Sequence, residues 1–124
     1  MMRKMLCLFF LSALLAAPAI GQSAAEQAKI NYLIDSVAAL HDARFIRSGT
    51  EYDSVRAADH LRLKLHRSAG RVETALDFIV YCATGSTING ERYRIRFSDG
   101  RIVDSAEFLR GKLAAYEARP SHPG

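Results

Sequence analysis

The apolar positions along the chain follow two different periods, and each period predicts its own kind of secondary structure. Over residues 24–42, apolar side chains recur at steps of three and four residues, the period of a helix: Ile30, Leu33, Ile34, Val37 and Leu40. Over residues 92–97 the period changes to two, which is typical of a strand with one buried face. The chain therefore combines helices with at least one strand.

Three further helices are predicted from similar patterns. One covers about residues 54–67, with Asp53 placed to accept a bond from a free backbone N–H as its N-cap. The other two cover about residues 75–84 and 105–118. Each of them follows a residue pair that resembles a capping box, Thr74 with Asp77 and Asp104 with Glu107. Gly85 is well placed to end the third helix.

Residues 60–67 fit both periods. Their polar and apolar side chains alternate, as in a strand, whereas the upstream Ala57-Ala58 and the absence of turn residues favour a helix. We predict a helix here, in which Leu63 faces away from Leu61 and Leu65.

The strand and its neighbours predict a small antiparallel unit before the last helix. Tyr93, Ile95 and Phe97 should face the core, while Arg92, Arg94 and Arg96 form the opposite face. Asp99-Gly100 favours a two-residue hairpin turn, which would pair Phe97 with Ile102 and point both inward. Asn89-Gly90 is a similar turn sequence and would pair residues 87–88 with 91–92 in a three-stranded meander. Earlier in the chain, Phe45-Ile46 is a single extended rung that Gly49 ends.

These elements predict an α+β fold. We expect one small domain of three to four helices, with a short antiparallel β-hairpin or meander before the last helix. Its ordered part should cover about residues 24–118.

The first 21 residues have the layout of a secretory signal peptide. Arg3 and Lys4 precede an apolar run at residues 6–15, and small residues follow. The run is too short to span a bilayer core, which needs about 20 apolar residues. We expect cleavage before Gln22, with a cut after Ala19 as the alternative. The domain of residues 22–124 is then exported, with no membrane span left after cleavage.

Composition adds two constraints. The chain has 17 basic and 13 acidic residues, and loss of Arg3 and Lys4 lowers its net charge from +4 to +2, so no nucleic-acid partner is expected. Cys82 is the one cysteine after residue 21, which excludes an intrachain disulfide in the exported domain. We interpret Cys82 as a small buried hydrophobe, and a reactive or intermolecular thiol is the alternative.

No motif for metal binding or catalysis stands out. His60 and His66 are six residues apart, so on a helix they point in different directions, and we expect no metal site. No nucleophile motif and no phosphate-binding glycine loop occurs, so no cofactor is expected. Glu51 is a lone loop carboxylate that could act as a general acid or base, although such groups are usually only solvated.

Two cationic features remain as candidate sites. One lies on the second helix, where His60, Lys64 and Arg67 share a face. The other is an arginine comb, the set Arg92, Arg94 and Arg96, whose side chains lie about 7 Å apart along one face of a strand. Either feature is an ordinary solvated face or a surface for a carboxylate or phosphate partner, for which guanidinium groups are well suited.

Four stretches of the chain resemble the YfeK-like family of small proteobacterial proteins, which have a signal peptide and one domain of unknown function. They are residues 45–52, 57–64, 74–79 and 93–95, with residues 60–64 the most specific part. The resemblance implies a Gram-negative periplasmic location and brings no activity. It directs attention to four positions of unknown role: Glu51, His60, Arg62 and Lys64.

The sequence is compatible with two candidate functions. The first is a non-enzymatic periplasmic binding or accessory module, which uses a cationic surface to contact an anionic periplasmic or envelope component. The alternative is a small cell-wall-directed, hydrolase-like enzyme that uses Glu51 and His60. A pocket that holds these two residues side by side would favour the enzyme.

Overall fold

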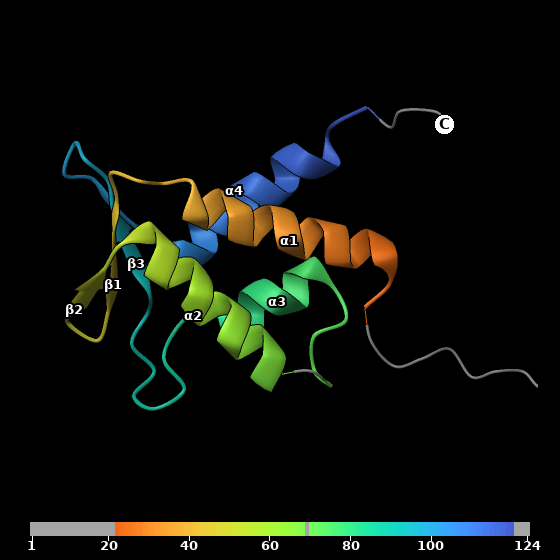
Figure 1. Ribbon diagram of the computed structural model, residues 1–124, viewed down its shortest axis with the longest axis horizontal. Coiled ribbons are helices and arrows are strands. Elements are labelled where there is room, and N and C mark those ends of the chain that lie inside the picture. Colours follow the sequence, from red (N-terminus) through yellow and green to blue (C-terminus); the bar gives the residue numbers. More distant parts are fainter. Residues whose placement is uncertain (1–21, 69, 121–124) are drawn as a thin grey trace, which may run out of the picture.

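The computed structural model describes residues 22–68 and 70–120, which form four helices and a four-stranded antiparallel sheet. The α+β prediction is confirmed. Figure 1 shows the helices gathered on one side of the sheet. The elements in chain order are α1 (Ala24–Ala38), β1 (Arg44–Arg47), β2 (Thr50–Tyr52), α2 (Ser54–Arg67), α3 (Ala75–Cys82), β3 (Arg94–Arg96), β4 (Ile102–Asp104) and α4 (Ser105–Glu117). The predicted signal peptide lies outside the described residues.

The second helix has the predicted bounds and settles the ambiguity of residues 60–67. The Asp53 carboxylate accepts a bond from the Arg56 backbone N–H at 2.9 Å, as an N-cap does. Leu61 is buried while Leu63 is 43% exposed, which is the helical outcome of the alternating pattern.

The other helices begin where expected and end slightly earlier. The capping box of Thr74 and Asp77 is present at the start of α3. Gly85 does not end this helix. It lies opposite Arg92 in an isolated bridge, where a Cβ atom would come within 2.7 Å of the Glu91 carbonyl oxygen. The glycine is required there because two backbone segments approach closely.

The predicted capping box before α4 is wrong. Asp104 is the N-cap residue by position, but its side chain makes no capping bond. Its carboxylate instead accepts a bond from Arg92 Nη1 at 2.8 Å. The ion pair with Arg92, which lies just before β3, takes the place of the local bond to the backbone.

The sheet has the order β2-β1-β3-β4, and one of its hairpins was not predicted. Residues 44–47 and 50–52 pair through a two-residue turn at Ser48 and Gly49, both with positive φ. Such turns match the twist of antiparallel strands. The single rung expected at Phe45-Ile46 is therefore a strand in the middle of the sheet.

The second hairpin has a different register from the predicted one. Ile102 lies opposite Arg96 rather than Phe97, because residues 98–100 form a three-residue loop with Gly100 at φ 89°. A shift of one residue turns a side chain to the other face of a strand. Ile102 therefore faces outward and is 50% exposed, in contrast to the prediction.

The predicted pairing of residues 87–88 with 91–92 is also wrong. The Ser86 N–H bonds the Glu91 carbonyl and the Gly90 N–H bonds the Ser86 carbonyl, which gives a closed turn in place of a strand pair. The partner of β3 on that side is β1.

The core lies between the helices and the inner face of the sheet, which is the face that carries Phe45 and Ile95. Ile95 and the helix residues Leu33, Phe78 and Leu109 are all 0% exposed. Among the helices of the described residues, none is long and apolar enough to cross a bilayer.

Candidate functional site

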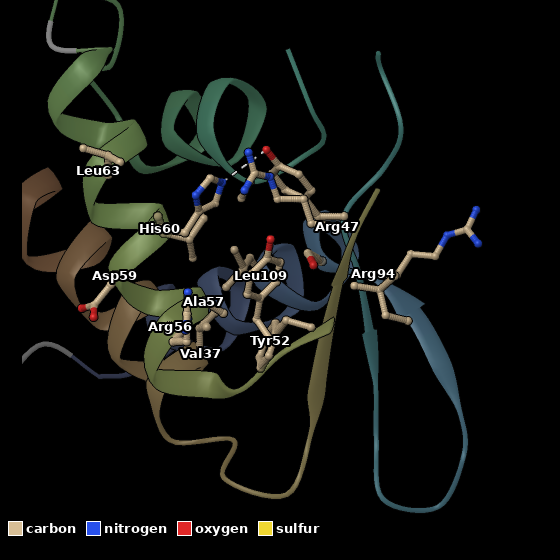
Figure 2. A pocket seen from close by; sticks show the side chains of 16 residues that line it. Val37, Arg47, Tyr52, Arg56, Ala57, Asp59, His60, Leu63, Arg94 and Leu109 are labelled. Atoms are coloured by element: carbon tan, nitrogen blue, oxygen red, sulfur yellow. Dashed lines mark hydrogen bonds between the residues drawn. The ribbon is translucent and has the colours of Figure 1, made fainter. Parts of the chain in front are cut away.

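A pocket of about 570 Å³ lies between α2 and the inner face of the sheet (Figure 2). Its walls come from segments that are distant in sequence: Val37, Phe45, Ile46, Arg47, Tyr52, Arg56, Ala57, Asp59, His60, Leu61, Leu63, Ala83, Tyr93, Arg94, Ser105 and Leu109.

The middle of the pocket is apolar. Val37 of α1 and Leu109 of α4 are buried core residues that form part of the wall, and Phe45 of β1 adds an aromatic ring. Ala57 of α2 is half-buried, and its small side chain leaves room beside it. The pocket is therefore an extension of the core toward solvent.

One end of the pocket is polar and is organised around the Tyr93 hydroxyl. Lys64 Nζ donates to this hydroxyl at 3.0 Å and to the Gly85 carbonyl at 3.1 Å. His60 Nε2 lies 3.5 Å from the same hydroxyl. Figure 2 shows Arg47 extending from β1 toward His60. α2 thus brings His60 and Lys64 to the Tyr93 hydroxyl, and β1 brings Arg47 to the same end of the pocket.

The charges at this end are not balanced by nearby acids. Within the described part of the chain, neither Arg47 nor Lys64 has a carboxylate within 4.0 Å. Asp59 also lines the pocket, but its Oδ1 lies 3.0 Å from Arg62 Nη1 and Figure 2 shows it directed away. Burial lowers the pKa of His60 below its usual value, and the charge of Arg47 lowers it further. Both effects favour the neutral form of His60.

The opposite end of the pocket is formed by Tyr52 and Arg56. The Arg56 guanidinium carbon lies 5.8 Å from the centre of the Tyr52 ring, within the range of a cation–π contact.

The four positions taken from the family resemblance fall into three places. His60 lines the polar end of the pocket, and Lys64 bonds the Tyr93 hydroxyl there without being a lining residue itself. Arg62 faces solvent and pairs with Asp59, and its Nη2 also lies 3.8 Å from Asp35. Glu51 lies on the outer face of the sheet, where Arg96 Nη2 is 2.6 Å away and Arg44 is 3.9 Å away. The structure therefore separates Glu51 and His60, which lie on opposite faces of the sheet.

The side chains of the arginine comb lie on the outer face, as the alternation predicts, while Tyr93 and Ile95 are buried on the inner face. Arg94 also borders the pocket, but Figure 2 shows its side chain extending away from it. Each arginine of the comb has a carboxylate neighbour. Arg92 and Arg94 lie 2.8 and 3.8 Å from Asp104, and Arg96 pairs with Glu51. The role of the comb in binding stays a prediction.

Sequence reasoning missed Arg47, Tyr52 and Arg56 as site residues. The first two face the pocket because β1 and β2 form a hairpin, and that hairpin was not predicted. The turn sequence Ser48-Gly49 between two short alternating stretches is the signal that could have revealed them.

Cys82 is fully buried, which confirms its interpretation as a core residue. Burial also raises the pKa of its thiol, so the reactive thiolate is disfavoured. Among the described residues, no three His, Cys, Asp or Glu side chains are grouped in a way that could hold a metal ion.

Residues 24–117 match the model of a family of unknown function, DUF5329. The chain belongs to this family. A relative of this DUF5329 chain is the uncharacterized protein YfeK of Salmonella typhimurium, which is 37% identical over 93 residues. The aligned part covers 74% of this chain and 77% of YfeK, and it confirms the resemblance to the YfeK-like family. No solved structure matches the chain.

Proposed function

We propose that this DUF5329 protein acts in the periplasm as a non-enzymatic binding protein, whose pocket between α2 and the sheet holds a small molecule with an apolar body. The observation that carries the proposal is the pocket itself. Its volume of about 570 Å³ falls within the range of about 300–1,000 Å³ that is typical of small-molecule sites.

The size of the pocket is notable for so small a domain. Protein interiors are close-packed, and voids larger than a water molecule are few, because atoms that line a void lose their dispersion contacts. Here Val37, Phe45 and Leu109 belong to the buried core and also line the pocket. A ligand with an apolar body would pack against these side chains.

The separation of Glu51 from His60 supports binding over the alternative of a cell-wall hydrolase. A general acid–base pair needs both groups within reach of one substrate. Glu51 is held by Arg96 on the outer face, whereas His60 lines the pocket on the inner face. The pocket's own carboxylate, Asp59, is engaged by Arg62.

The periplasmic location rests on the N-terminal sequence. Its positive start, short apolar run and small-residue exit support export. Intact-mass measurement of protein from a periplasmic extract should show a loss of about 20 residues. Recovery of the full-length chain from the cytoplasm or inner membrane would overturn this location.

A second candidate function is favoured by the charges of the outer face. Among residues 22–68 and 70–120, Arg44 and the arginine comb share two neighbouring carboxylates there, Glu51 and Asp104. An anionic envelope component could contact this face through the surplus guanidinium groups.

The binding proposal is tested by filling the pocket. Ala57→Leu places a larger side chain in the wall, and leucine is a good helix former, so α2 should remain intact. The probe is a neutral naphthylamine dye whose emission rises in apolar surroundings. We expect the protein to bind it and Ala57→Leu to weaken binding about tenfold or more.

The matched control is Ala114→Leu, the same change at an exposed position of α4 that does not line the pocket. It should leave dye binding unchanged. Absence of dye binding by the unmodified protein, or equal binding by the Ala57→Leu protein, would overturn the proposal.

A further inference from the structure

We infer that the ligand is a single-chain amphiphile with an anionic head group, whose chain occupies the apolar middle of the pocket and whose head binds between Arg47, Lys64 and Tyr93. This inference rests on the proposed function and adds the chemistry of the ligand. The shared feature of the head group is a carboxylate or phosphate oxygen.

Two cations without a nearby acid lie at one end of the pocket. Arg47 lines that end, and Lys64 bonds the Tyr93 hydroxyl there without itself being a lining residue. Among the described residues no carboxylate lies within 4.0 Å of either cation. The outer face of the same sheet shows the contrasting arrangement, because each arginine of the comb has an acid beside it. A partly buried cation without a counterion favours an anionic ligand, which would supply the missing charge.

The polar end of the pocket has an excess of hydrogen-bond donors. Lys64 carries three N–H donors and uses two of them, on the Gly85 carbonyl and the Tyr93 hydroxyl. The Tyr93 hydroxyl accepts from Lys64 and also lies 3.5 Å from His60 Nε2, while Arg47 contributes a guanidinium fork. A carboxylate or phosphate consists only of acceptors, so it complements this set.

These donors lie beside an apolar wall. The donors lie at one end of the pocket, and Val37, Phe45, Leu61 and Leu109 line its interior. A ligand that satisfies both parts needs a charged head joined to an apolar body. The volume of about 570 Å³ suits one drug-sized chain better than a two-chain phospholipid.

The experiment compares four molecules with the same alkyl chain and different heads, by isothermal titration calorimetry below their micelle concentrations. Dodecanoate and dodecyl phosphate carry an anion, dodecanol is neutral, and dodecyltrimethylammonium is a cation. We expect both anions to bind about tenfold or more tightly than the alcohol, and the cation to bind most weakly. The ratio between the two anions distinguishes a carboxylate from a phosphate source.

Two variants locate the head group. Arg47→Gln and Lys64→Gln each remove one cation from the polar end, and each should weaken anion binding about tenfold while leaving dodecanol binding unchanged. Arg96→Gln removes the same charge from the outer face, does not line the pocket, and should leave all four affinities unchanged. Thermal unfolding of each variant shows whether it is folded.

The possible failures are distinguishable. If dodecanol and the anions bind equally well and Ala57→Leu abolishes both, the pocket binds apolar bodies and the anionic head is overturned. If Arg96→Gln weakens the anions and Arg47→Gln does not, the head group binds on the outer face and the inference is overturned. If none of the four binds while the naphthylamine dye does, the single-chain amphiphile is overturned and the proposed function stands; if the dye does not bind either, both are overturned.

Discussion

The two faces of the sheet carry arginines in opposite circumstances. On the outer face, Arg92 and Arg96 lie 2.8 and 2.6 Å from the carboxylates of Asp104 and Glu51. On the inner face, Arg47 extends toward His60 at the end of an apolar pocket, and the described residues place no acid within 4.0 Å of it.

The contrast shows that the number of cations on a face is a poor guide to a binding site. The arginine comb is conspicuous in the sequence because its residues alternate with apolar ones, yet much of its charge is matched by neighbours in the fold. Arg47 is inconspicuous in the sequence, yet its charge has no neighbouring acid among the described residues and is available to a ligand. The charge that remains after pairing with neighbouring acids is therefore a better guide to a binding site than the number of cations.

The largest expected effect tests which side chains belong to each face. Ile95 is 0% exposed on the inner face and Ile102 is 50% exposed on the outer face. Ile95→Ala should lower the free energy of unfolding by about 2–5 kcal/mol, because it opens a cavity in the core. Ile102→Ala should change it by no more than about 0.5 kcal/mol. Urea unfolding of both variants measures the difference, and similar losses would contradict the three-residue loop register.

A smaller loss of folding stability is expected at acidic pH, and its cause is His60, which faces the inner side of the sheet. The pKa of His60 is lowered by burial and by Arg47, Lys64 and Arg67, so in the range just below its usual value the unfolded chain binds more protons than the folded one. Folding stability should therefore fall as the pH falls through about 6.5 toward the folded-state pKa, and level off below it.

Urea midpoints between about pH 8 and about pH 5 check this prediction. His60→Gln should flatten the part of the profile that His60 causes. His66→Gln is the control, because His66 is exposed on the same helix. An unchanged profile in the His60→Gln protein would mean that other groups cause the acid sensitivity.

The smallest effect is expected on the outer face. Arg94→Gln with Arg96→Gln removes two exposed guanidinium groups, and exposed ion pairs each contribute about 0–1 kcal/mol. The urea midpoint should barely move. If an anionic envelope component binds this face, its affinity should fall and become less dependent on salt, which titrations at two salt concentrations would detect. Unchanged binding would show that Arg94 and Arg96 of the comb do not contact this component.

The sequence alone was sufficient to predict the structure wherever one periodic stretch of residues determines it. The bounds of α2 follow from Asp53 and the spacing of Ala58 and Leu61, and the two faces of β3 follow from strict alternation. Burial of Cys82 follows from its position on the apolar stripe of α3. In each of these cases the deciding contacts are local or repeat with one period.

The parts of the fold and of the pocket that were not predicted depend on turns of a few residues and on contacts between distant segments. The β1–β2 hairpin has strands of four and three residues, too short to show a clear period. The three-residue loop at 98–100 and the two-residue alternative differ by one residue around the same Asp99-Gly100. The pocket joins Val37, Ala57 and Leu109, and no local pattern relates residues so far apart.

The two edge strands of the sheet have a consequence for how copies of this protein behave when crowded together. β2 and β4 are three residues each, and each runs almost directly into a helix, at Ser54 and Ser105. An unpaired strand edge is a template on which another chain can add a strand, and its capacity grows with its length. Here each edge strand gives way to a helix after three residues, which leaves little backbone for another chain to pair with. Charged side chains also lie on these strands, Glu51 on β2 and Asp104 on β4. The fold thus resists growth into larger β-structures by its topology, at the very residues that also partner the outer arginines.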